Sequence, residues 1–179
     1  DANRQSALFD KDKAEALAQK IQGKEFRVYE MKAADKATPP PMLYDLTELQ
    51  REANSRFGYS AKETLNIMQR LYENHKVLTY PRTDSRYLSS DVVPTIKDRL
   101  RACGTGPYRK LAGALLNQNI TAKPSFVDDR KVSDHHAIIP TEQYVQLDHM
   151  TVDERRIYDL VVRRFLAVLY PPYESQQVS

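Results

Sequence analysis

The 179-residue chain is long enough to bury one hydrophobic core, and its 41% hydrophobic and 28% charged residues are ordinary for a globular protein. Its net charge of +3, from 27 Lys and Arg against 24 Asp and Glu, permits a polyanionic partner without requiring one. The single cysteine, Cys103, excludes an internal disulfide and favours a reducing compartment. The four histidines are too scattered to predict a zinc site, and no apolar run is long enough to cross a membrane. The first residue is Asp rather than Met, which predicts an excised piece of a longer chain.

The N-terminal part of the sequence predicts a helix, a strand and a stiff connector. Asp10 is expected to cap a helix that runs to Gln22 and stops at Gly23. Residues 25–34 alternate in a way that favours a strand. Residues 37–42 contain three consecutive prolines, which predicts an extended connector and a boundary.

Helical patterns begin after this connector. Thr47 is expected to cap a helix that ends at Phe57, and Ser60-Ala-Lys-Glu63 is a capping box for the following helix. The two helices, joined by a short turn, resemble a helix-turn-helix pair, although an ordinary helical hairpin fits the pattern better.

Further helices are expected in the second half of the chain. A cap at Ser90 or Asp91 predicts one helix, and residues 108–117 predict another in which Leu111 and Ala114 face inward together with Leu115. Between residues 120 and 133 the sequence is polar and irregular, which is typical of a loop.

The C-terminal part predicts one long helix and a strand. A second capping box at residues 151–154 opens the helix, Pro171-Pro172 ends it, and residues 173–179 favour a strand. The patterns as a whole therefore predict a mainly α fold with short β pieces near the two ends.

Residues 78–91 contain the candidate chemistry, with Tyr80 at its centre. Pro81 favours an extended backbone at Tyr80. Alternate side chains of an extended segment share a face, so Tyr80 and Arg82 are expected to point the same way. Tyrosine is a weak nucleophile at neutral pH, but a neighbouring guanidinium would stabilise its phenolate and could hold a phosphate oxygen through two hydrogen bonds. The pair therefore suits attack on a phosphodiester, while the alternative is that Tyr80 only packs, as most tyrosines do.

Longer segments carry a resemblance to a known family. Tyr80-Pro-Arg-Thr-Asp-Ser-Arg-Tyr-Leu88 resembles the active-site segment of type IA DNA topoisomerases, and its proline and its Arg-Tyr-Leu ending are similar to the topoisomerase III branch. His135-His-Ala-Ile-Ile-Pro-Thr141 resembles the downstream motif of that family. Pro40-Pro-Met-Leu-Tyr44 and Leu71-Tyr-Glu73 also lie where members have similar residues. Order and spacing agree over nearly the whole chain.

The resemblance implies a role for each matched residue. It implies that Tyr80 cleaves one DNA strand and becomes joined to the 5′ end of the break, so that religation needs no ATP. Arg82 is implied to neutralise the pentavalent phosphate and to help position the tyrosine, and His135 to contact the scissile phosphate region. The residues implied to lie near the DNA strand are Thr83, Asp84, Arg86, Ser133 and His136.

The resemblance also implies how the chain is divided and what it lacks. Residues 43–170 would form the helical domain that bears the tyrosine, and residues 1–42 and 171–179 would be the incoming and outgoing flanks of a gate-forming arch domain. The family's acidic cluster for Mg²⁺ lies in a Toprim domain with no counterpart here, so no metal ligand is expected in this chain. The expected partners are single-stranded DNA and that Toprim domain, in the bacterial cytoplasm at the nucleoid and without a membrane. Alone, the chain is expected to bind DNA weakly and not to cleave it.

Two other functions fit parts of the sequence. A non-catalytic helical DNA-binding module would need only the basic residues and the helix-turn-helix-like pair, with Tyr80 as a packing residue. A tyrosine recombinase-like strand transferase would form a 3′ linkage, but that class places its tyrosine after its Arg and His residues. Here Tyr80 precedes His135, which argues against it.

Overall fold

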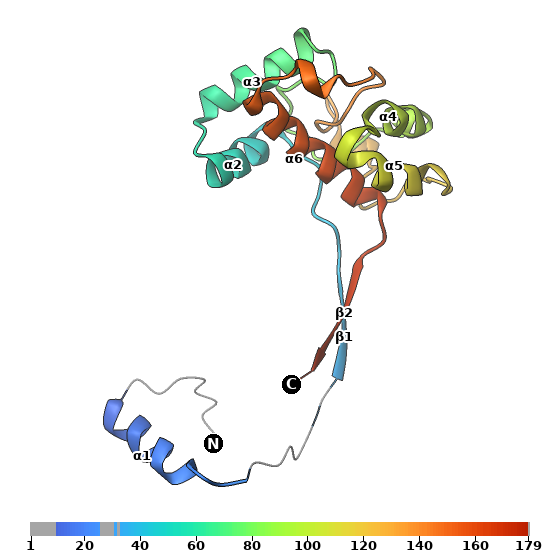
Figure 1. Ribbon diagram of the computed structural model, residues 1–179. Helices are drawn as coiled ribbons and strands as arrows, with labels where there is room; N and C mark the ends of the chain where they lie inside the picture. Colours follow the sequence, from blue (N-terminus) through green and yellow to red (C-terminus); the bar gives the residue numbers. More distant parts are fainter. Residues whose placement is uncertain (1–9, 26–30, 32, 179) are drawn as a thin grey trace. The chain divides into compact units, whose positions relative to one another are not determined.

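The computed structural model of the protein describes residues 10–25, 31 and 33–178, and the chain divides into two compact units (Figure 1). One unit comprises residues 37–175, and the other comprises residues 1–36 and 176–179. The larger unit contains all the described helices except the first, and it is called the helical unit below.

Helix α1 (Lys11–Ile21) belongs to the smaller unit. As predicted, the Asp10 carboxylate caps it by accepting a hydrogen bond from the Lys13 amide, and the helix ends at Gln22. None of its residues is buried, so its apolar stripe remains exposed, including Leu17.

Two short strands lie where the chain enters and leaves the helical unit. Strand β1 (Ala33–Thr38) pairs with β2 (Tyr173–Val178). The chain runs toward the helices along β1 and away from them along β2, so the two strands are antiparallel (Figure 1). The strand predicted at residues 25–34 overlaps β1 only at its end. Residues 26–30 and 32 of that prediction lie outside the described part of the chain.

The two helices predicted after the proline connector are both present, but the residue that caps the first of them differs from the prediction. Helix α2 (Leu46–Phe57) is capped by Asp45, whose carboxylate accepts a hydrogen bond of 2.7 Å from the Glu48 amide, so the prediction of Thr47 as cap was wrong. Gly58 ends α2 in the left-handed conformation with φ of 74°. Helix α3 (Ala61–Glu73) begins with the predicted capping box.

The middle of the helical unit contains shorter helices. A 3₁₀ turn (Ser90–Thr95) leads into α4 (Ile96–Cys103), and a second turn (Gly106–Tyr108) leads into α5 (Arg109–Leu116).

The predicted inward face of α5 was partly wrong. Leu115 is buried, but Leu111 is 42% exposed and Ala114 is exposed, and Ala112 is buried in their place. Ala112 lies close to the backbone near Gly104, where an added Cβ would be only 3.1 Å from the Ala112 methyl. A small side chain therefore faces α4, and the larger leucine is turned away.

Helix α6 (Val152–Leu169) lies at the centre of the core. It begins with the predicted Thr151–Glu154 capping box, contains ten buried residues and packs against α2, α3 and α5 (Figure 1). The long connection between α5 and α6 contains two further 3₁₀ turns, Asp129–Lys131 and Leu147–His149. The prediction of a mainly α fold is therefore confirmed. None of the helices in the described ranges is both long enough and apolar enough to span a membrane.

Candidate active site

Tyr80 follows a short extended segment that pairs with the segment containing the downstream motif. The Thr79 amide donates a hydrogen bond of 3.0 Å to the Ile139 carbonyl, and the Ile139 amide donates one of 3.0 Å to the Thr79 hydroxyl. Leu78 and Pro140 form an antiparallel bridge beside them. This pairing brings together the two motifs that the sequence singled out, although they lie far apart along the chain.

The Tyr80 ring lies between two other aromatic rings. Its centroid is 4.4 Å from that of His135 in a tilted arrangement, and 5.4 Å from that of Tyr72, which meets it nearly edge-on at 78°. Tyr80 is partly buried, so it is neither a core residue nor a free surface side chain. Contacts from α3 on one side and from the downstream motif on the other therefore restrict the phenol.

Thr83 joins three segments of the site through its backbone and side chain. Its hydroxyl donates a hydrogen bond of 2.9 Å to the His135 carbonyl, and its own carbonyl accepts one of 3.1 Å from the Leu46 amide. Its hydroxyl oxygen also accepts a hydrogen bond from the Ser85 amide. The hydroxyl proton is thus used inside the protein, and Thr83 is only 8% exposed.

The charged residues of the tyrosine segment differ in their surroundings. Arg86 is partly buried, and its Nε donates a hydrogen bond of 3.1 Å to the Leu43 carbonyl. Arg82 and Asp84 are exposed, and neither forms a hydrogen bond or ion pair with another residue in the described part of the chain. The guanidinium of Arg82 therefore remains available to an anion.

Two adjoining cavities surround these residues. The first has a volume of about 350 Å³ and is lined by Thr79, Tyr80, Ser89, Asp91, Asp129, Val132, Ser133, Asp134, His135 and His136. The second has a volume of about 390 Å³ and is lined by Leu46, Thr47, Arg82, Thr83, Asp84, Ser133, Asp134 and His135.

The cavities show which predicted residues come together. Tyr80 lines the first cavity and Arg82 the second, so the two side chains do not share one cavity as neighbours on one face would. Ser133, Asp134 and His135 line both cavities and connect them. Arg86 lines neither, since it is turned toward the Leu43 carbonyl.

Three carboxylates in the first cavity were missed by the sequence analysis. Asp91 lies in the 3₁₀ turn before α4, whereas Asp129 and Asp134 lie in the connection between α5 and α6, so the three carboxylates do not form one local motif in the sequence. A hydrogen bond from Ser89 holds the pKa of Asp91 below its ordinary value, which keeps this carboxylate charged at neutral pH. Their negative charge opposes a phosphate close to Tyr80 unless a cation offsets it.

His136 is held as a neutral imidazole. Burial lowers its pKa, although a hydrogen bond to the Ala137 carbonyl acts in the opposite direction. The distance from Nδ1 to that carbonyl oxygen is 2.7 Å, and a carbonyl can only accept, so Nδ1 is the protonated nitrogen. The Nε2 atom is then left as an acceptor, whereas His135 beside it is exposed.

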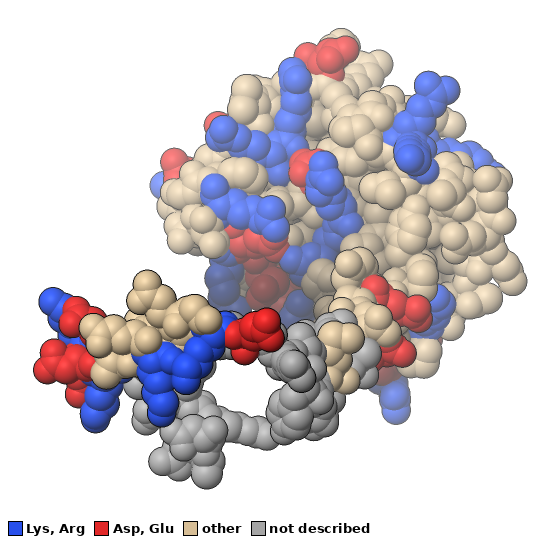
Figure 2. All heavy atoms as spheres, turned by 60° about the horizontal axis from the view of Figure 1, so that its bottom comes forward, with Lys and Arg blue, Asp and Glu red and all other residues tan. Residues whose placement is uncertain are grey.

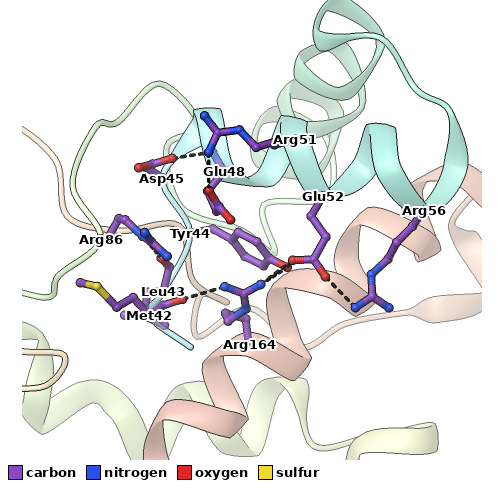
Figure 3. Close-up of polar contacts among 10 residues, drawn as sticks. All are labelled: Met42, Leu43, Tyr44, Asp45, Glu48, Arg51, Glu52, Arg56, Arg86 and Arg164. Carbon is purple, nitrogen blue, oxygen red and sulfur yellow. Dashed lines mark hydrogen bonds and ion pairs between the residues drawn. The ribbon is translucent and has the colours of Figure 1, made fainter. Parts of the chain in front are cut away.

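An ionic cluster attaches the segment that follows the proline connector to α6. Nη1 of Arg164 donates a hydrogen bond of 3.0 Å to the Met42 carbonyl, while Nη2 contacts the Tyr44 hydroxyl and the Glu52 carboxylate (Figure 3). The Arg164 guanidinium also lies 4.0 Å from the centre of the Tyr44 ring. Burial raises the pKa of Glu52, but hydrogen bonding to Tyr44 and the charges of Arg164 and Arg56 outweigh it, so the pKa lies below its ordinary value.

The same segment is bonded to both motifs of the site. Nε of Arg86 donates to the Leu43 carbonyl, and both residues are drawn in Figure 3. The Ile138 amide donates to the Tyr44 carbonyl at 2.9 Å. The Leu46 amide donates to Thr83, one residue after Arg82. The chain entering the helical unit is therefore tied directly to the tyrosine segment and to the downstream motif.

Charge on the surface is mixed. On the face drawn in Figure 2, Lys and Arg side chains form separate groups with Asp and Glu side chains among them, rather than one continuous basic surface. Within residues 10–25, 31 and 33–178, no group of three or more His, Cys, Asp or Glu side chains could hold a metal ion. The described residues therefore do not fit a magnesium site of their own.

Comparison with known proteins adds independent evidence. The family model described as DNA topoisomerase matches residues 1–179. The protein called DNA topoisomerase 3 from Bacillus thuringiensis (strain Al Hakam) is 59% identical over 179 residues, which is all of this chain and 25% of that protein. The one from Shouchella clausii (strain KSM-K16) is 53% identical over 178 residues, 99% of this chain and 24% of that protein. The chain thus spans about a quarter of the length of these relatives.

A solved structure agrees with these relatives. Full-length topoisomerase I from Thermotoga maritima matches 98% of this chain and 28% of its own, with a TM-score of 0.62 and 26% sequence identity. The chain belongs to the DNA topoisomerase family, as its resemblance to the type IA enzymes of the topoisomerase III branch predicted.

Proposed function

We propose that this chain supplies the nucleophile of a topoisomerase that cuts one DNA strand, passes a strand through the break and reseals it. The observation that carries the proposal is the contact between the two motifs, in which the Tyr80 ring lies 4.4 Å from His135. Tyr80 lines a cavity rather than the core, which supports a chemical role over a packing role.

In the proposed reaction the Tyr80 oxygen attacks the phosphorus of a phosphodiester. A bond forms between this oxygen and phosphorus, the bond from phosphorus to the 3′ oxygen breaks, and the phenol proton leaves while the 3′ oxygen gains one. The product is a 5′-phosphotyrosine and a free 3′ hydroxyl. Because one phosphodiester replaces another, the reverse reaction reseals the strand without ATP.

The surroundings of each side chain suggest its part in this reaction. Arg82 is exposed and without an ion pair among the described residues, which suits neutralisation of the phosphate charge. Ser133 and His135 line the cavities of both Tyr80 and Arg82, so a phosphate between the two would meet them. His136 lines the first cavity and Asp84 the second, and both are proposed to lie beside the strand.

Thr83 and Arg86 are better suited to holding the site together. The Thr83 hydroxyl donates to the His135 carbonyl, and Arg86 holds the Leu43 carbonyl through Nε. A DNA contact by Arg86 would have to use its two remaining nitrogens. Loss of either residue is expected to disturb Tyr80 indirectly.

The rest of the enzyme is proposed to lie outside this chain. Residues 43–170 would be the tyrosine domain, and residues 1–42 and 171–179 the flanks of an arch domain that moves it. Mg²⁺ would supply positive charge at the cleavage site and would be held by a separate Toprim domain, since the described residues here do not fit a metal site. A location at the nucleoid in the bacterial cytoplasm is part of this proposal and follows from the proposed DNA substrate, and the relatives that this chain matches are bacterial.

The test uses the full-length protein that contains this chain, with Mg²⁺ and a single strand carrying different labels at its 5′ and 3′ ends. We expect a covalent adduct that retains only the 3′ label and disappears in Tyr80→Phe. Tyr87→Phe is the matched control, because it removes a tyrosine hydroxyl from the same segment without touching the proposed nucleophile.

Each other result has a definite meaning. An adduct that retains the 5′ label would indicate the recombinase-like chemistry and would contradict the proposal. An adduct that persists in Tyr80→Phe would assign the nucleophile to another residue. Salt-sensitive DNA binding by the full-length protein with no adduct under any condition would favour the non-catalytic DNA-binding module.

A further inference from the structure

We propose that a third cavity, on the α3 side of Tyr80, binds one nucleotide of the cut strand and that its base stacks on Tyr72. The cavity has a volume of about 640 Å³ and is lined by Tyr72, Glu73, Lys76, Leu78, Thr79, Tyr80, His136 and Thr141. This inference rests on the proposed function, because it names how that site would hold its substrate. It adds Tyr72, to which the family resemblance gave no role in DNA binding.

The position of the cavity relative to Tyr80 is the first argument. Tyr80 and His136 line both this cavity and the one of about 350 Å³, so the phenol stands between the two. A strand whose phosphate meets Tyr80 in the first cavity has a neighbouring nucleotide within reach of the other. The volume lies within the range of about 300–1,000 Å³ that is usual for small-ligand sites.

The second argument is the exposure of Tyr72. It is 37% exposed, and its ring meets Tyr80 nearly edge-on, which leaves a face of the Tyr72 ring without an aromatic partner. Exposed tyrosine faces are the usual stacking surface for unpaired bases in proteins that bind single strands, because every base has a π-face.

The third argument is Lys76, which supplies positive charge at the same cavity. Its ammonium forms no ion pair in the described part of the chain. Its backbone is in the left-handed region with φ of 59°, an unusual conformation for a residue other than glycine, and the Thr141 hydroxyl holds its carbonyl at 2.6 Å. Strained backbone of this kind concentrates at functional sites. A phosphate of the bound nucleotide would pair with this ammonium, and Glu73 limits how closely that phosphate can approach α3.

The experiment measures equilibrium binding of short single strands to the full-length protein carrying Tyr80→Phe, which prevents cleavage but keeps the ring. One abasic site is moved along the strand, one position at a time. Each strand is measured with Tyr72 present and with Tyr72→Ala. Thermal unfolding of each variant confirms that the proteins are folded.

If Tyr72 stacks on a base, Tyr72→Ala weakens binding of the intact strand about thirtyfold, the middle of the range for one base–aromatic stack. An abasic site at one particular position should weaken binding to the Tyr72 protein by the same factor and have no effect on Tyr72→Ala. Tyr72→Phe should bind as the parent does. Tyr173→Ala, which removes another exposed tyrosine that does not line this cavity, should bind normally.

Several results would overturn the inference. Unchanged affinity in Tyr72→Ala, or equal weakening with every abasic strand, would show that no single base stacks there. Normal binding with slower cleavage when Tyr80 is restored would make Tyr72 a residue that only positions the nucleophile. Failure of the proposed function is a separate result, because then the protein with both Tyr72 and Tyr80 intact would itself form no adduct.

Discussion

The ionic cluster around Tyr44 gives the sharpest test of how the helical unit is held together. We expect Arg164→Met to destabilise residues 37–175 strongly. Arg164 is 12% exposed and its partner Glu52 is 17% exposed, so the variant leaves a carboxylate in a poorly solvated position. It also removes the hydrogen bond to the Met42 carbonyl and the cation over the Tyr44 ring.

The magnitude follows from the burial of the cluster. Removing one partner of a buried ion pair usually costs about 3–5 kcal/mol, because the remaining charge is unpaired. Arg56 also pairs with Glu52 and is 60% exposed, so it can shield part of that charge. We therefore expect a loss of about 3 kcal/mol, against a total stability of about 5–15 kcal/mol for a typical domain.

The adjacent arginine on α6 provides the control. Arg163 pairs with Asp159 one turn away, and the two side chains are 60% and 36% exposed, so Arg163→Met should cost less than about 0.5 kcal/mol. Urea unfolding followed by circular dichroism would measure both variants. The reasoning fails if the two variants lose the same stability. It also predicts that adding Glu52→Gln to Arg164→Met restores part of the loss, since no buried charge then remains.

Three further predictions concern single side chains. Burial raises the pKa of Glu154, but hydrogen bonds from the Thr151 amide, Arg70 and His75 outweigh this effect, so the pKa in the folded protein lies below the ordinary value of 4.5. The resulting stabilisation is complete when the pH is above the pKa of the unfolded chain, and it is lost as the pH falls through the lower pKa of the folded protein. Glu154→Gln should therefore be less stable at pH 7 by about 1–3 kcal/mol and lose less stability on acidification. Urea unfolding of both proteins at pH 7 and pH 4 measures this, and an equal loss of unfolding free energy between the two pH values in both proteins would contradict it. Lys76→Gly should be more stable than Lys76→Ala by about 1 kcal/mol in thermal unfolding, because φ is 59°; equal stability would mean that the backbone relaxes. Burial raises the pKa of the Cys103 thiol to about 12, so it should react with a thiol reagent only after unfolding, and rapid modification of the native protein would be inconsistent with its 1% exposure.

Helix ends were predictable where the signal is contained in four consecutive residues. Both capping boxes, Ser60–Glu63 and Thr151–Glu154, form as predicted because their hydrogen bonds are local. The start of α2 depended on a distant residue instead. The Leu46 amide donates to the Thr83 carbonyl, so α2 begins there and Asp45, not Thr47, occupies the capping position.

In the candidate site, too, features that depend on neighbouring residues were predictable, whereas features that depend on distant residues were not. The extended backbone at Tyr80 follows from the proline after it, and its meeting with His135 agrees with the two motifs that the sequence singled out. Tyr72 and the carboxylates of the first cavity reach the surroundings of Tyr80 only through tertiary packing, which has no local signature in the sequence. The same holds for Arg164 and Glu52, which are joined by an ion pair between helices α6 and α2.

The antiparallel pairing of β1 and β2 determines how mechanical load reaches the helical unit. A pulling force applied between Ala33 and Val178 acts on the same end of the strand pair, since one strand enters and the other leaves there. Such a force opens the pair one hydrogen bond at a time, like a zipper, and each opening requires little work. Tension would thus be absorbed by the two strands before it reached Met42, where the carbonyl bonded to Arg164 begins the folded helical core.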